Sequence, residues 1–333
     1  MTGIHERFQA FVAERHDDRV DRGVREVGPG MLSPGEVDIR VAYSSVNYKD
    51  ALAATANGRV ARISPLIPGI DLAGTVVASR APGIAVGSAV LAHGYEIGVS
   101  HHGGYAEYAR VPADWVVPLA PGLSPRDAMT VGTAGFTAAM SVIALEARGL
   151  TPDDGPVLVT GASGGVGGTA LSILLDRGYE VWAVTGKPEL HGQLRARGVA
   201  GILSHAEVTA EGKPLETERW GGAIDAVGAA TLPYVLRTLR QGAAVAASGN
   251  ASGPALVTTV FPFILRGCAI LGMDSAHVPI ADRREIWDRI ATELRPRDLG
   301  ERVTEIGLGD LPGALDTILE GRATGRWLVR VAG

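Results

Sequence analysis

A strand-like apolar run that breaks into a glycine-rich turn, residues 157–167, constrains the fold of this chain more than any other segment. The sequence there is Val-Leu-Val-Thr-Gly-Ala-Ser-Gly-Gly-Val-Gly, and we expect a helix over 168–177. Small residues let the backbone turn tightly and approach a ligand closely, and a helix N-terminus offers N–H groups to phosphate. The segment therefore predicts a dinucleotide-binding site in which the pyrophosphate contacts Ala162, Ser163, Gly164, Gly165 and Val166.

The end of the next predicted strand, 180–185, indicates which dinucleotide is bound. An NAD site usually has Asp or Glu at this position, to accept hydrogen bonds from the ribose hydroxyls. This chain instead has Thr185, Gly186 and Lys187, and the first carboxylate is Glu189. A lysine and a hydroxyl suit the 2′-phosphate of NADP, so the sequence favours NADPH. The alternative is that Lys187 is an ordinary solvated loop charge.

The remaining pattern divides the chain into three segments. Residues 1–125 contain short alternating runs at 37–43, 72–78, 89–92 and 104–112, separated by Pro/Gly turns, which is typical of a small β-barrel. Residues 126–273 alternate helices with apolar strands at 157–161, 180–185, 223–227, 243–248 and 268–272, which predicts a parallel sheet. Residues 198–203 add a possible strand, and helix 126–148 is expected to break near 132–135. Residues 274–333 contain two expected helices and a terminal strand, and are expected to complete the first, β-rich domain. We therefore expect a nucleotide-binding domain inserted into a β-rich domain.

Composition excludes several classes of function. The net charge is −5 and there is no basic run, so nucleic acid is not an expected partner. The N-terminus has no apolar signal core, and no run of 18 apolar residues suggests a membrane span. A single cysteine, Cys268, excludes an internal disulfide and a multi-cysteine zinc site, and is expected to be a small core residue. We therefore expect a soluble cytoplasmic protein.

Several strings along the chain resemble the medium-chain dehydrogenase/reductase superfamily, in particular its zinc-free quinone-oxidoreductase-like branch and the NADPH-dependent acrylyl-CoA reductase group. They include Asn47-Tyr-Lys-Asp, Gly69-Ile-Asp, Gly103-Gly-Tyr-Ala-Glu, Gly132-Thr-Ala-Gly-Phe-Thr, Phe261-Pro-Phe-Ile-Leu-Arg-Gly and Gly325-Arg-Trp. The resemblance implies an α/β fold, with a Rossmann doubly wound sheet inserted in a GroES-like barrel and a cleft between the two. It also implies a homodimer formed through the edge strand at 268–272.

The resemblance also bears on metal binding. Zinc-dependent members hold the metal with a cysteine near the Asn47 region and a Gly-His-Glu string. Here the corresponding string is Gly69-Ile70-Asp71, and no cysteine lies near Asn47. We therefore predict no zinc. His93, His101 and His102 lie in one loop region, but without a carboxylate or cysteine at ligand spacing they are not predicted to bind metal.

A metal-free site favours reduction of an alkene conjugated to a carbonyl, or of a quinone, over alcohol oxidation. The resemblance to the acrylyl-CoA reductase group implies acrylyl-CoA as substrate and propanoyl-CoA as product. NADPH would deliver hydride to the β-carbon, and the charge that develops on the carbonyl oxygen needs hydrogen-bond donors. The predicted catalytic residues are Asn47, Tyr48 and Asp71, with Asp71 orienting Asn47 or water; Tyr48, Asn250, Ser275 and Arg326 are expected near the cofactor. Lys49 and Asp50 are expected to form a solvated pair.

Two other functions remain open from the sequence. One is reduction of a quinone or small enone with the same cofactor, and the other is a non-catalytic NADPH-binding protein. A CoA thioester requires basic residues for its phosphates, for which Arg59, Arg62 and Arg110 are candidates.

Overall fold

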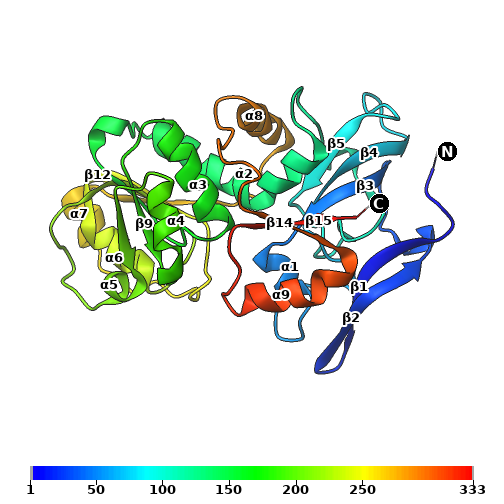
Figure 1. The fold of residues 1–333 in the computed structure, drawn as a ribbon, viewed down its shortest axis with the longest axis horizontal. Coiled ribbons are helices and arrows are strands. Elements are labelled where there is room, and N and C mark those ends of the chain that lie inside the picture. The colour runs from blue at the N-terminus through cyan, green and yellow to red at the C-terminus, as the bar shows by residue number, and fades with distance from the viewer. Residues whose placement is uncertain (1–2, 332–333) are drawn as a thin grey trace. The chain divides into compact units, whose positions relative to one another are not determined.

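The computed structural model describes residues 3–331, which form two compact units. Of these described residues, the first unit contains 3–133, 275–292 and 299–331, and the second contains 134–274 and 293–298. The first boundary between the two units lies between Thr133 and Ala134, inside the helix Pro125–Ala147. The sequence predicts this boundary before the helix, at 125/126. A short return segment, 293–298, also joins the second unit. Figure 1 shows the path of the chain through both units.

The first unit is built on a seven-stranded sheet with the order β14-β15-β3-β4-β5-β7, in which β6 also pairs with β3. Most neighbours are antiparallel, and the C-terminal strands join the sheet through β15 on β3. The strands are β3 (Val37–Ser45), β4 (Asp71–Ser79), β5 (Ala89–His93), β6 (Tyr108–Val111), β7 (Val116–Pro118), β14 (Val303–Gly307) and β15 (Arg326–Arg330). The helices are α1 (Tyr48–Ala53), α8 (Ile280–Ala291) and α9 (Leu311–Leu319). Two expected features are present: a β-rich N-terminal segment and a returning C-terminal strand.

A hairpin of β1 (Phe8–His16) and β2 (Arg19–Val27) precedes this sheet, and sequence reasoning missed it. Phe8 and Phe11 are buried and make edge-on contacts with Tyr108 and Tyr105. β2 is mostly polar and partly exposed, so its period-two pattern is weak. These aromatic contacts join residues about 100 positions apart in the chain, which no local pattern reveals.

The second unit contains a six-stranded parallel sheet with the order β10-β9-β8-β11-β12-β13. This is the doubly wound order 3-2-1-4-5-6 of a Rossmann fold, and it confirms the predicted fold class. The strands are β8 (Val157–Val159), β9 (Val181–Thr185), β10 (Gly201–Ser204), β11 (Trp220–Asp225), β12 (Leu239–Ala247) and β13 (Ala269–Gly272). The helices around the sheet are α3 (Gly165–Asp176), α4 (His191–Ala196), α5 (His205–Thr209), α6 (Thr231–Thr238) and α7 (Phe261–Arg266).

Glycines explain where the expected elements differ from the observed ones. The strand expected over 104–112 is only Tyr108–Val111, because the chain at Gly103 and Gly104 lies against the backbone of Gly69 and Asp71. A Cβ on either glycine would clash with those backbone oxygens. Residues 103–104 are thus a close-approach loop beside the start of β4 and not part of a strand.

The long helix α2 (Pro125–Ala147) is kinked at Gly132, within the region where a break was expected. Gly132 has φ 55° and ψ −166°, a conformation that only glycine adopts readily. α2 is long and apolar enough to cross a membrane, but 83% of its most apolar window is buried inside the protein, as in a core helix.

Candidate active site

Asp71 is the centre of a buried polar cluster in the first unit. It is the first residue of β4 and is fully buried. Its carboxylate accepts hydrogen bonds from Ser45 N at 3.0 Å, Ser45 Oγ at 2.8 Å, Asn47 Nδ2 at 3.0 Å and Thr133 N at 2.9 Å. These four donors provide the compensation that a buried carboxylate needs. The contact with Asn47 is the one predicted from the sequence.

The kink at Gly132 makes two of the contacts in this cluster possible. It interrupts α2, so the Thr133 N–H points to Asp71 and the Thr130 carbonyl accepts from Arg326 Nε at 3.1 Å. A Cβ at position 132 would lie 2.7 Å from Ser45 Oγ and 2.9 Å from Asp71 Oδ2, and it would also clash with Arg326. The glycine therefore permits the helix backbone to approach the cluster.

Arg326 supplies the positive charge of the cluster. It is the first residue of β15 and is buried. Its guanidinium donates to Ser45 Oγ at 2.6 Å and to Asn47 Oδ1 at 3.3 Å. Burial lowers the pKa of Arg326, while the charge of Asp71 acts in the opposite direction. The Asn47 amide is thus held at both ends, its nitrogen by Asp71 and its oxygen by Arg326.

Asp50 is buried and is not one partner of a solvated pair with Lys49, so that expectation was wrong. Its side chain is 0% exposed and accepts from the N–H groups of Asn47, Gly69 and Ile70 at 2.8–3.1 Å. Burial and then the charge of Asp71 raise the pKa of Asp50 to about 7. Asp50 links the start of α1 to the Gly69–Ile70 turn, and this arrangement brings Asn47 and Asp71 together.

Tyr48 is much more exposed than the residues of this cluster. It is the first residue of α1, directly after Asn47, and it is 37% exposed. A buried, hydrogen-bonded amide beside an exposed phenol is a suitable arrangement for positioning a ligand oxygen. The structure therefore brings Asn47 into hydrogen-bond contact with both Asp71 and Arg326, and Tyr48 directly follows Asn47 in the chain.

In the second unit, the glycine turn has the geometry that a pyrophosphate site requires. Gly161 has φ +60°, and a Cβ on Gly167 would clash with the carbonyls of Thr160 and Gly161. α3 begins at Gly165, three residues earlier than expected, so Gly165 and Val166 lie in its first turn, where N–H groups have no partner within the helix. Ser163 Oγ accepts from Thr185 Oγ1 at 3.3 Å. The turn is thus tied to the end of β9.

The end of β9 is ordered by its own side chains. Thr185 Oγ1 accepts the Lys187 N–H at 3.1 Å, and partial burial lowers the pKa of Lys187. Sequence reasoning missed His205, which follows β10 and lies beside this tip: its Cβ is 3.8 Å from where a Cβ on Gly186 would be. The strand expected over 198–203 could have indicated His205, because the carboxyl ends of adjacent parallel strands lie at the same edge of the sheet. In the register, Ser204 pairs with Thr185.

Asn250 and Ser275 follow β12 and β13, as expected from the strand pattern. Asn250 is exposed, and its carbonyl accepts from Gly253 N. Ser275 is partly buried, and its carbonyl accepts from Arg283 at 3.2 Å. Each residue lies a few positions beyond the carboxyl end of a parallel strand, where such folds bind ligands.

The three histidines have structural partners. His93 contacts Arg283 and Trp287, His101 contacts the Arg110 carbonyl, and His102 accepts from Ile67 N. Burial lowers the pKa of all three, that of His102 to about 4. Among residues 3–331, no group of three His, Cys, Asp or Glu side chains is arranged to hold a metal ion. Cys268 is a buried free thiol.

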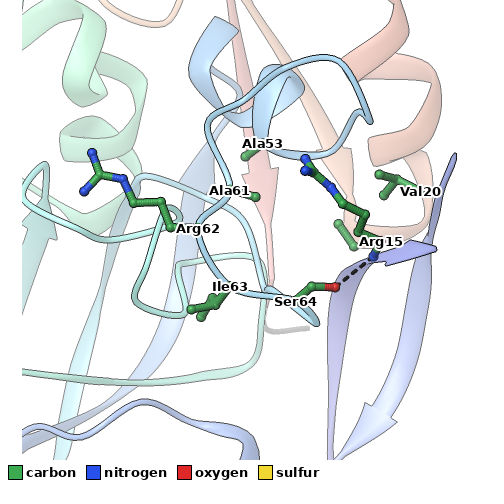
Figure 2. Close-up of a pocket in the computed structure, with 8 residues that line it drawn as sticks. Arg15, Val20, Ala53, Ala61, Arg62, Ile63 and Ser64 are labelled. Carbon is green, nitrogen blue, oxygen red and sulfur yellow. Dashed lines mark hydrogen bonds between the residues drawn. The ribbon is translucent and has the colours of Figure 1, made fainter. Parts of the chain in front are cut away.

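A pocket of about 160 Å³ lies between the β1–β2 hairpin and the loop after α1. Figure 2 shows Arg15 extending over it toward Ala53, while Arg62 points away. Arg62 faces Glu96 at 3.5 Å, and Arg110 pairs with Asp38 at 2.6 Å. Arg110 is therefore charge-compensated and is a poor candidate for binding a CoA phosphate.

Comparisons with known proteins agree with this architecture. Residues 33–121 match the alcohol dehydrogenase GroES-like domain. The chain is 47% identical to the putative quinone oxidoreductase YhfP of Bacillus subtilis and 46% identical to the acrylyl-CoA reductase AcuI of Ruegeria pomeroyi, each over 97% of this chain and 99% of the relative.

Solved structures are equally similar. The yhdH oxidoreductase from Salmonella enterica in complex with NADP has a TM-score of 0.95 and 47% identity, covering 97% of this chain and all of that one. The Bacillus subtilis protein yhfP with NAD bound has a TM-score of 0.94 and 46% identity, covering 98% of this chain and all of that one. With full-length relatives at this level of identity, a GroES-like segment and a Rossmann sheet, the chain belongs to the medium-chain dehydrogenase/reductase superfamily.

Proposed function

We propose that this protein is an NADPH-dependent reductase of C=C bonds conjugated to a thioester carbonyl, with acrylyl-CoA as substrate and propanoyl-CoA as product. The observation that carries the proposal is the Asn47 amide, fixed at both ends by Asp71 and Arg326 and adjacent to the exposed Tyr48. The names of the full-length relatives supply the substrate class.

The residues of this chain fit the cofactor. Gly161 and Gly167 permit the tight turn that precedes α3, and the first turn of α3 provides N–H donors for a pyrophosphate. Lys187 and Thr185 suit a 2′-phosphate, and His205 adds a donor beside Gly186. We assign the nicotinamide half to Tyr48, Asn250, Ser275 and Arg326. When bound, NADPH supplies the hydride.

In the proposed mechanism, the chain stabilises charge on the substrate and uses no metal ion. Hydride addition at the β-carbon moves an electron pair to the thioester oxygen, and a proton must then reach the α-carbon. The Tyr48 hydroxyl donates to that oxygen, while Asn47 fixes the start of α1 and hence the position of Tyr48. The positive Arg326 offsets the buried negative charge of Asp71, which keeps the cluster rigid during the reaction.

We further propose a cytoplasmic homodimer formed through β13. β13 is the last strand at one edge of the six-stranded sheet, and unpaired edges favour pairing with another strand. The preceding segment exposes a group of large apolar side chains, with Val257 82% and Ile264 68% exposed, together with Val260, Phe261 and Leu265. An apolar patch beside a free edge fits a second copy related by a two-fold axis.

A panel of acceptors tests the proposed activity. The initial rate is measured with acrylyl-CoA, crotonyl-CoA and a simple quinone, each with NADPH and with NADH. The proposal expects the highest kcat/KM for acrylyl-CoA with NADPH. A higher value for the quinone would favour the activity named for YhfP, and failure to oxidise NADPH with any acceptor would refute an enzymatic role.

A further inference from the structure

Arg283 connects α8 to the segment that leaves β13. It is 0% exposed, and its guanidinium donates to the carbonyls of Ser275 at 3.2 Å and Ala276 at 3.0 Å. A third carbonyl, that of Val278, lies at 3.4 Å. All three contacts are made by Nη2, whose two hydrogens are shared among these carbonyls, so one nitrogen orients several peptide groups at once. The backbone of 275–278 is therefore held by one buried cation.

Tyr95 contacts two of the same carbonyls, those of Ala276 and Val278. Its ring lies 4.5 Å from the Arg283 guanidinium carbon, its N–H donates to the Ala276 carbonyl at 2.7 Å, and its hydroxyl donates to the Val278 carbonyl at 3.2 Å. The preceding Gly94 has φ +75°, and a Cβ there would lie 2.9 Å from the Ala276 carbonyl oxygen. The close approach of the two segments thus depends on a glycine.

His93 joins this arrangement to the Asp71 cluster. It lies opposite Asp71 in the β4–β5 register, and Arg283 Nη1 is 2.9 Å from its ring nitrogens. The Trp287 indole donates to His93 Nε2 at 2.9 Å; because an indole N–H can only donate, Nε2 carries no proton. Burial and then the charge of Arg283 lower the pKa of His93, and its Nδ1 lies 3.5 Å from Thr133 Oγ1. Thr133 in turn donates its N–H to Asp71.

We propose that Arg283 is a positioning residue that fixes Ser275 to Val278 as a preformed wall for the nicotinamide half of NADPH. The segment follows the carboxyl end of β13, where ligands bind in parallel sheets, and it contacts through His93 and Thr133 the cluster that orients Asn47. The inference rests on the proposed function for the identity of the cofactor. It assigns a role to a buried arginine that touches neither substrate nor cofactor.

Binding of two ligands distinguishes this role from general stabilisation. Arg283→Gln and Arg283→Lys are compared with wild type for binding of NADPH and of 2′,5′-ADP, which contains the adenine half alone. We expect Arg283→Gln to weaken NADPH binding about tenfold and to lower kcat roughly ten- to hundredfold, as small misplacements do, with 2′,5′-ADP binding unchanged. Arg283→Lys keeps the charge but reaches fewer carbonyls, so it should restore part of both losses.

The neighbouring Arg284→Gln is the matched control, because Arg284 makes a single 3.3 Å contact with the Val116 carbonyl. If the Arg283 variants do not fold, Tyr95→Phe, which removes only the bond to Val278, should produce a smaller change of the same kind. Equal weakening of both ligands, or wild-type NADPH binding and kcat in these variants, would overturn the inference. A wild-type protein that does not bind NADPH would overturn the proposed function as well.

Discussion

Replacing Gly132 with alanine tests whether the kink in α2 is required for the polar cluster. The backbone conformation there, φ 55° and ψ −166°, costs a non-glycine residue about 1–3 kcal/mol. The new Cβ would lie 2.7 Å from Ser45 Oγ and 2.9 Å from Asp71 Oδ2, and would clash with Arg326. Overpacking of this kind costs about 1–3 kcal/mol. Together the two effects predict a loss of about 2–6 kcal/mol in the free energy of unfolding.

Gly149→Ala separates these two effects. Gly149 also has a positive φ, +95°, but nothing lies within 4 Å of its Cβ position. Its replacement should therefore cost only the backbone conformation, about 1–2 kcal/mol. Urea unfolding followed by tryptophan fluorescence gives both free energies, and steady-state assays give kcat.

We expect Gly132→Ala to be less stable than Gly149→Ala and to lose most of its activity, because Asp71 and Arg326 must move. Gly149→Ala should keep wild-type kcat. Equal stability of the two variants, together with wild-type activity in Gly132→Ala, would refute the reasoning that the kink serves the cluster.

Three further predictions concern the cofactor, the dimer and the buried carboxylate. Lys187→Glu should weaken NADPH binding roughly ten- to hundredfold and leave NADH binding unchanged, since only NADPH carries the 2′-phosphate; Lys213→Glu, in an exposed loop, is the control, and unchanged NADPH affinity would contradict the assignment. Ile264→Asp should convert a dimer of twice 34.5 kDa into a monomer in light scattering, whereas Val86→Asp, elsewhere on the surface, should not; a wild-type monomer would contradict the interface. Asp50 has its pKa raised from 3.8 to about 7, so folding favours its protonated form and its contribution to stability should fall as pH rises from about 4 to 7 and stay constant above that. The free energy of unfolding of wild type minus that of Asp50→Asn should therefore fall over this pH range and stay constant above it. A value of this difference that rises with pH would contradict the prediction.

The glycine turn and the Rossmann strands could be predicted because their signals are local. A buried parallel strand is an apolar run, and a phosphate turn needs small residues at fixed spacing. The order of elements after residue 157 follows from the same pattern, and only the bounds of the strands differ by a few residues. The unexpected helices, such as α5 and α7, have only five or six residues, so they are too short to show a helical periodicity in the sequence.

The Asp71 cluster was only partly predictable. The contact between Asn47 and Asp71 was expected from resemblance, but the burial of Asp50 was not, because Lys49-Asp50 has the local character of a solvated pair. Its burial depends on the N–H groups of Gly69 and Ile70, about 20 positions away. Arg283 was also missed, since it lies in the charged stretch Ala281-Asp-Arg-Arg-Glu, where sequence alone indicates a solvent-exposed helix face.

The position of the transferred hydrogen in the product tests the central claim most directly. NADPH that carries deuterium at both C4 positions is incubated with the protein and acrylyl-CoA in ordinary water, and the product is analysed by mass spectrometry and NMR. The account predicts propanoyl-CoA with one deuterium on the β-carbon and a solvent proton on the α-carbon. Deuterium on the α-carbon, or no consumption of acrylyl-CoA, would contradict it.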